Sequence, residues 1–118
     1  QAVDTISWPS ELESLRFGSD FNQPLSGVRW PEGLKRLTFG EEFNQPVESV
    51  SWPPSLERLI FVFFFNQPVD RVLWPSRLTH LSLGHHFNQS IASVVWPVGL
   101  REIIFGQLFD QVRFRLID

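Results

Sequence analysis

The sequence contains no cysteine, which excludes disulfide bonds and cysteine-ligated metal sites. No apolar run approaches the roughly 20 residues that a membrane-spanning helix needs, and no signal-peptide pattern is present. Charge is sparse as well: 10 basic and 13 acidic residues leave a net charge of −3. The electrostatic field of so small a net charge is too weak to indicate nucleic acid or an anionic membrane as the partner.

Recognisable catalytic motifs are also missing. The chain has no glycine-rich phosphate loop, no His-Glu-x-x-His, no EF-hand spacing and no nucleophile elbow. Its histidines are His80, His85 and His86. A metal site would need a third ligand at the same end of the molecule, so we interpret them as solvated residues at a turn. We predict a protein that is not an enzyme, carries no cofactor or metal, and has no evident small-molecule substrate.

What the chain does contain is one motif at a constant spacing of 22 residues. The three clearest series are Trp8, Trp30, Trp52, Trp74 and Trp96; Phe21, Phe43, Phe65, Phe87 and Phe109; and Asn22, Asn44, Asn66 and Asn88. A spacing without insertions predicts that each repeat is one turn of a solenoid, which we call a coil, and that identical residues stack. The phenylalanines should then form an aromatic spine inside one corner.

Each coil carries an apolar pattern that predicts a short β-strand. In the third coil Leu59-x-Phe61 alternates with period two, which is typical of a strand with one buried face. Parallel stacking, at about 4.8 Å per coil, should bury the column Leu15, Leu37, Leu59, Leu81 and Ile103. A second pattern, Val47-x-x-Val50-x-Trp52, predicts a shorter extended segment on an opposite β-wall.

Proline indicates where the coil bends. Eight of the nine prolines follow the repeated tryptophan or the repeated glutamine, and proline cannot donate to a β-ladder. Proline at both corners leaves too few uninterrupted residues for the helix found in many leucine-rich repeats. We therefore predict an all-β fold: a right-handed parallel β-solenoid, similar to leucine-rich repeats, of about five 22-residue coils with little or no helix.

Two further columns indicate how the corners are built. Glycine follows most of the predicted strands, and we expect these glycines to take positive φ; they are Gly18, Gly40, Gly84 and Gly106. Val62 interrupts the column, which predicts a different turn in the third coil because a β-branched residue tolerates positive φ badly. We expect the asparagines to be buried and to bond the backbone and the asparagine of the next coil.

The repeat also determines the expected domain organisation. Residues 1–118 should form a single repeat-solenoid domain. Gln1 is in register with Gln23, so we expect a fragment of a longer array. Residues 112–118 lack the repeated tryptophan and proline, and we interpret them as a divergent terminal or capping coil.

The pattern Leu-x-x-Leu-x-Phe-Gly-x-x-Phe-Asn-Gln-Pro resembles the FNIP repeat, a 22-residue relative of the leucine-rich repeats. Residues 39–47 and 83–89 fit closely, and the resemblance extends over essentially the whole chain. This chain has Trp-Pro where that family usually has Leu-Pro or Ile-Pro. The resemblance implies an interaction array without catalytic residues. Some members carry the array after an F-box, which implies recruitment of ubiquitylation targets, although these residues contain no F-box.

Two surface features are candidate contact sites. On the outward side of the predicted strands Arg36 stacks beside Arg58, a like-charge pair that favours an acidic partner and that Glu57 and Glu102 are expected to relieve. Phe63 and Phe64 occupy bend positions that are mostly polar elsewhere. They form either an exposed apolar patch or a bend that refolds to bury one ring. The candidate protein-binding residues are Phe63, Phe64, Arg36, Arg58, Ile60 and His80.

These observations predict a non-enzymatic repeat scaffold that mediates protein–protein interaction. The alternative is a structural protein that self-associates end to end into a filament or extracellular layer, because the end of a solenoid is an open sheet edge. A polysaccharide-binding or polysaccharide-cleaving solenoid is a weaker alternative, since it needs a row of exposed aromatic and acidic residues on one wall and the tryptophan column is expected to face inward. The expected partner is therefore another protein or a second copy.

Overall fold

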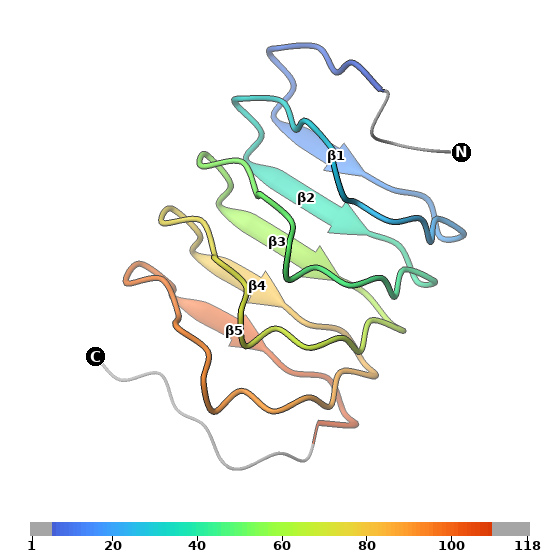
Figure 1. Ribbon diagram of the computed structural model, residues 1–118, viewed down its shortest axis with the longest axis vertical. Coiled ribbons are helices and arrows are strands. Elements are labelled where there is room, and N and C mark those ends of the chain that lie inside the picture. Colours follow the sequence, from blue (N-terminus) through green and yellow to red (C-terminus); the bar gives the residue numbers. More distant parts are fainter. Residues whose placement is uncertain (1–5, 110–118) are drawn as a thin grey trace.

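The computed structural model describes residues 6–109, so the expectation for residues 112–118 lies outside the described part (Figure 1). Regular structure consists of five short strands: β1 (Ser14–Arg16), β2 (Arg36–Phe39), β3 (Arg58–Phe61), β4 (His80–Ser82) and β5 (Glu102–Ile104). The described residues form no helix, and accordingly none that could cross a membrane.

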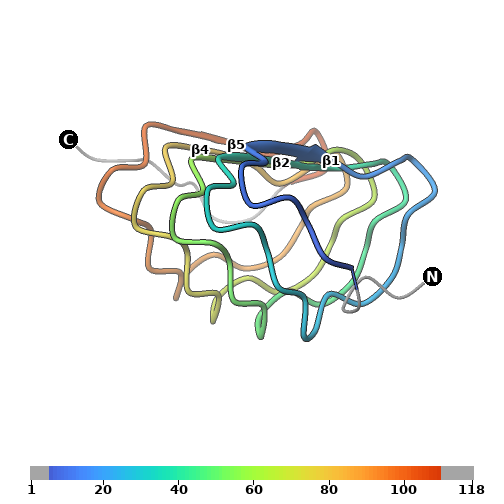
Figure 2. The same cartoon turned by 90° about the horizontal axis from the view of Figure 1, so that it is seen from above.

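All five strands pair in parallel in one sheet, in the order β1-β2-β3-β4-β5. The register follows the repeat, so that Leu59 pairs with Leu37 on one side and with Leu81 on the other. Each return segment passes in front of the sheet in Figure 1 and leads to the next strand along a right-handed path. Figure 2 shows the coils one behind another with every strand on the same side. This is the predicted right-handed parallel β-solenoid.

The core is made of stacked columns, as expected. Leu37, Leu59 and Leu81 are at most 1% exposed, while their counterparts in the two outermost strands are half-buried. The phenylalanine spine is also confirmed, because Phe65 stacks between Phe43 and Phe87 with ring centroids 6.3 and 6.2 Å apart. Burying each such side chain stabilises the fold by about 1.5–3 kcal/mol, and no single coil could bury it alone.

The expected second β-wall is wrong for the described residues. Val47 and Val50 are buried, but they bracket a turn in which the Val50 N–H donates to the Val47 carbonyl at 3.1 Å. The same bond joins Leu25 to Val28, Val69 to Val72, and Ile91 to Val94. Residues three apart in a strand point to opposite faces, whereas a turn can direct both inward. The Val-x-x-Val spacing therefore indicated a turn.

Two of the four repeated glycines, Gly40 and Gly106, are required by space and not by φ. Among the four, only Gly84 has positive φ, at 93°. A Cβ at Gly40 would lie 2.3 Å from the carbonyl oxygen of Gly18, and one at Gly106 would lie 2.2 Å from that of Gly84. Adjacent coils thus meet backbone to backbone at Gly40 and Gly106, which leaves no room for a side chain there, whereas a Cβ at Gly18 would meet no atom within 4 Å.

The third coil turns differently at Val62, as predicted. In the other coils the glycine carbonyl accepts a hydrogen bond from the phenylalanine N–H three residues later, as in Phe43 to Gly40 at 3.4 Å. Within residues 6–109 no such bond joins Phe65 to Val62, and Val62 keeps a negative φ. The third coil therefore has a bend where the others have a hydrogen-bonded turn. Gly18, Gly40 and Gly106 keep that turn without positive φ, so intolerance of positive φ by valine is not the cause of the bend.

The asparagine column forms a hydrogen-bonded ladder. Asn22 Oδ1 accepts the Asn44 N–H at 2.9 Å, and the same bond links Asn44 to Asn66 and Asn66 to Asn88. Gln45 Nε2 donates to the same Asn22 Oδ1 at 3.0 Å. The bonding to the neighbouring backbone is confirmed, but the predicted burial is wrong, since Asn44 is exposed and Asn66 half-buried. Each side chain reaches toward the next coil instead of into the core.

The glycine contacts give a matched pair of variants. Gly40→Ala should lower the free energy of unfolding by about 1–3 kcal/mol, because the new Cβ forces two coils apart. Gly33→Ala should be near neutral, since its Cβ would meet no atom closer than 4.0 Å. Urea denaturation measures both, and equal effects would show that backbone contact between coils is not the constraint.

The ladder makes a second prediction. Asn66→Ala should cost about 1–2 kcal/mol, because the Asn88 N–H and Gln89 Nε2 lose the Oδ1 they share at 2.9 and 3.0 Å. Asn66→Asp keeps an oxygen at that position and should retain most of the stability. If the two variants have the same denaturation midpoint, Oδ1 is not the stabilising atom.

Candidate functional site

No second layer of the described chain covers the outer side of the sheet (Figure 2), and two columns of side chains lie on this face. Strand register defines one column as Ser14, Arg36, Arg58, His80 and Glu102, and the other as Arg16, Thr38, Ile60, Ser82 and Ile104. All ten residues are exposed or half-buried. The structure thus brings together four of the six predicted site residues, Arg36, Arg58, Ile60 and His80.

Arg36 and Arg58, which we call the arginine pair, are direct register partners on β2 and β3. Strands lie about 4.8 Å apart, a separation at which two like charges in water repel by about 1 kcal/mol. Neither guanidinium has an ion pair or hydrogen bond within residues 6–109. The expectation that Glu57 and Glu102 relieve the pair is therefore wrong.

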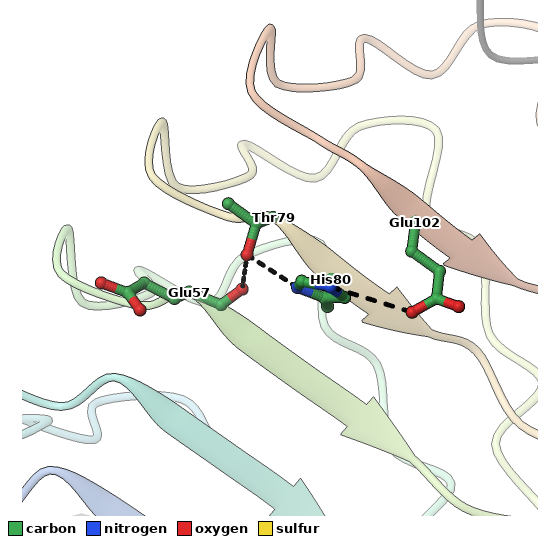
Figure 3. A network of polar contacts seen from close by, with 4 residues as sticks. All are labelled: Glu57, Thr79, His80 and Glu102. Carbon is green, nitrogen blue, oxygen red and sulfur yellow. Dashed lines mark hydrogen bonds and ion pairs between the residues drawn. The ribbon is translucent and has the colours of Figure 1, made fainter.

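Glu102 lies beside His80 instead, where the two form an ion pair when the imidazole is protonated (Figure 3). Its Oε1 lies 3.9 Å from His80 Nε2, while His80 Nδ1 lies 2.8 Å from Thr79 Oγ1. Thr79 Oγ1 donates its proton to the Glu57 carbonyl oxygen at 3.1 Å, so it is an acceptor for the ring N–H. In Figure 3 the Glu57 carboxylate points away from His80. The column of positive charge consequently ends at Arg58.

The bend after β3 holds an aromatic cluster formed by Phe63, Phe64, His85 and His86. Phe63 stacks on His85 with centroids 4.9 Å apart and meets Phe64 edge to face at 4.7 Å. Phe64 lies 4.8 Å from His86. Phe63 is half-buried whereas Phe64 remains 38% exposed. The structure therefore combines the two alternatives for this bend, by covering one ring and presenting the other.

Sequence reasoning missed the two histidines of the aromatic cluster. His85 and His86 are half-buried against the phenylalanines, so the interpretation of solvated turn residues is wrong. The repeat spacing could have predicted this contact, because each histidine follows its phenylalanine by 22 residues and must lie on the next coil. Flat rings at matched positions in adjacent coils stack.

Phe64 also borders a shallow hollow of about 400 Å³. The other lining residues are Asn22, Glu42, Asn44, Asn66 and His86. The Nδ2 groups of these three asparagines form no hydrogen bond within the described residues, so they present free donors beside an exposed ring. An aromatic centre with a polar rim is the composition expected of a contact surface.

Two other polar features contribute no evident chemistry. No group of three or more histidine, aspartate or glutamate side chains in residues 6–109 could hold a metal ion. The indole Nε1 atoms of Trp8, Trp30, Trp52 and Trp74 are buried without a hydrogen-bond partner in the same residues. An unsatisfied buried donor costs free energy. Whatever stability the tryptophan column contributes therefore comes from the apolar surface that it buries, and not from hydrogen bonds.

Fold and surface together define a one-sheet parallel solenoid of the leucine-rich-repeat kind. The FNIP repeat model matches residues 21–63 and 65–110, and the chain therefore belongs to the FNIP-repeat family, as its sequence resemblance indicated. Among solved structures, the crystal structure of CroV588, described as a novel circular LRR protein, is 40% identical, with a TM-score of 0.81 over 89% of this chain. The chain spans 16% of the length of that protein. No curated protein matches.

The aromatic cluster predicts unequal roles for its two phenylalanines. Phe63→Ala should cost about 1–3 kcal/mol, because a half-buried ring loses contacts with three other rings. Phe64→Ala should cost less than about 1 kcal/mol, because Phe64 is already 38% exposed and its loss leaves no enclosed cavity. Thermal and urea denaturation check the order, and a larger loss at Phe64 would assign it to the core.

Proposed function

We propose that this chain is a non-enzymatic scaffold that binds a protein partner through the outer sheet face and the adjoining aromatic cluster. The observation that carries the proposal is Phe64, a ring 38% exposed where the register positions in the neighbouring coils are Glu42 and His86. Repeat solenoids offer extended surfaces of this kind. Their fold supplies the surface, and departures from the repeat supply specificity.

Phe64 is already held in place before any partner arrives. The Phe63 and Phe64 rings meet edge to face with centroids 4.7 Å apart, and the His86 ring centroid lies 4.8 Å from that of Phe64. A side chain that is ordered in advance loses little conformational entropy on binding, and aromatic anchors commonly dominate interface energetics. The free asparagine donors around the hollow can satisfy carbonyl groups of a partner segment at the rim.

The charge of the outer face favours an acidic partner. Arg58 opens β3 and the aromatic cluster follows the end of the same strand at Phe61, so one extended segment could contact both. The arginine pair would then contribute mainly association rate and specificity, as rim charges usually do. The partner class is a protein segment with an apolar anchor and nearby negative charge.

The test is Phe64→Glu, with Leu73→Glu as the matched control because Leu73 is 85% exposed in the return segment between β3 and β4. Proteins captured by the wild type are identified, purified and titrated by calorimetry. Phe64→Glu should weaken binding about 30-fold, corresponding to about 2 kcal/mol, while Leu73→Glu leaves it unchanged. Equal affinity for wild type and Phe64→Glu would remove the cluster from the interface. Sedimentation velocity on the same samples reports whether the partner is a second copy.

A further inference from the structure

We propose that the arginine pair binds a phosphate monoester carried by the partner, such as a phosphorylated serine side chain. This inference rests on the proposed function, because it names the chemistry that the outer sheet face recognises. Its starting observation is that Arg36 and Arg58 are adjacent in register and exposed, and that neither has a counter-ion in the described residues.

The fold does not require arginine at these positions. The same column holds Ser14, His80 and Glu102 in the other coils, so strand pairing proceeds equally with a hydroxyl, an imidazole or a carboxylate. The arginine pair adds repulsion between neighbouring strands and forms no compensating hydrogen bond within residues 6–109. Residues that reduce stability without a structural return are typical of binding sites.

Two guanidinium groups on adjacent strands match a small dianion. Each guanidinium is a planar fork that donates two parallel hydrogen bonds. A phosphate monoester carries between 1.5 and 2 negative charges at neutral pH and offers three strong acceptor oxygens, enough to engage both forks at once. A single carboxylate carries one charge and two oxygens, and it is satisfied by one arginine.

The neighbouring residues limit the length of the anion. Beyond Arg58 the column continues to His80, whose Nε2 already lies 3.9 Å from the Glu102 carboxylate. Glu102 would repel a polyanion that continued along the column, which disfavours nucleic acid. Beside the pair, Ile60 is half-buried in the second column, an apolar contact for a residue next to the phosphorylated one. The ligand is therefore one phosphoryl group in an otherwise ordinary protein segment.

The experiment titrates the full chain with three peptides of one sequence that carry phosphoserine, serine or glutamate between apolar residues, and with inorganic phosphate. Side-chain N–H signals of Arg36 and Arg58 should shift with the phosphopeptide, which should bind at least tenfold more tightly than each other ligand. Arg36→Gln and Arg58→Gln should each weaken phosphopeptide binding at least tenfold. The control Arg77→Gln removes the same charge from an exposed turn before β4 and should have no effect.

The melting temperatures of the same variants distinguish a binding role of the two arginines from a structural one. Arg36→Gln and Arg58→Gln should melt at or above the wild-type temperature, and lower melting temperatures would make the arginines structural and overturn the inference. If Arg77→Gln weakened phosphopeptide binding as much, the effect would come from net charge and not from the arginine pair. If the glutamate peptide bound as tightly as the phosphopeptide, the site would not recognise phosphate. Equal affinity for inorganic phosphate would identify a free-anion site. Phe64→Glu should still bind the phosphopeptide, so failure of the two proposals is distinguishable.

Discussion

Coil-on-coil registration is the constraint on which the rest of this structure depends. Leu59 has Leu37 and Leu81 as its strand partners, and Phe65 lies between Phe43 and Phe87. A single coil buries none of these side chains on its own, because each needs a coil on either side. An insertion of one residue would turn the leucines outward and separate the backbone groups that pair across coils.

Registration also explains the residues that an isolated coil would not need. Gly40 is required by the carbonyl of the preceding coil, and Asn44 uses its side chain to bond the backbone N–H of Asn66. In both cases the interaction partner is 22 residues away in the sequence. The repeat is therefore a set of contacts between coils, and its most constrained positions are those where two backbones come closest.

The candidate surfaces occur where the repeat is broken or left free. Phe63 and Phe64 replace polar bend residues immediately after Val62 replaces glycine, and these changes coincide with the only described coil that lacks the turn hydrogen bond. The arginine pair lies in a column whose identity the fold does not determine. This separation allows the surface of a solenoid to change while its core stays constant.

Much of the architecture followed from the sequence alone. The invariant spacing determined the parallel register, the leucine column and the phenylalanine spine, because a periodic chain that stacks places equivalent residues together whatever the detailed path. The different turn at Val62 was indicated separately, by a valine in the glycine column. Spacing could not determine how each corner is closed. The valine segments were predicted as a strand and form a turn, since local apolar spacing alone did not distinguish the two.

Tertiary structure alone decided the depth of each side chain and its partners. Asn44 is exposed although its bonds are those expected, and Glu102 lies beside His80 and leaves the arginine pair without a counter-ion. The sequence could indicate that Phe64 departs from its column, but only the packing of Phe63 against His85 determined which ring stays exposed. Periodicity specifies which residues become neighbours, whereas side-chain direction and solvent exposure depend on the path of the backbone between them.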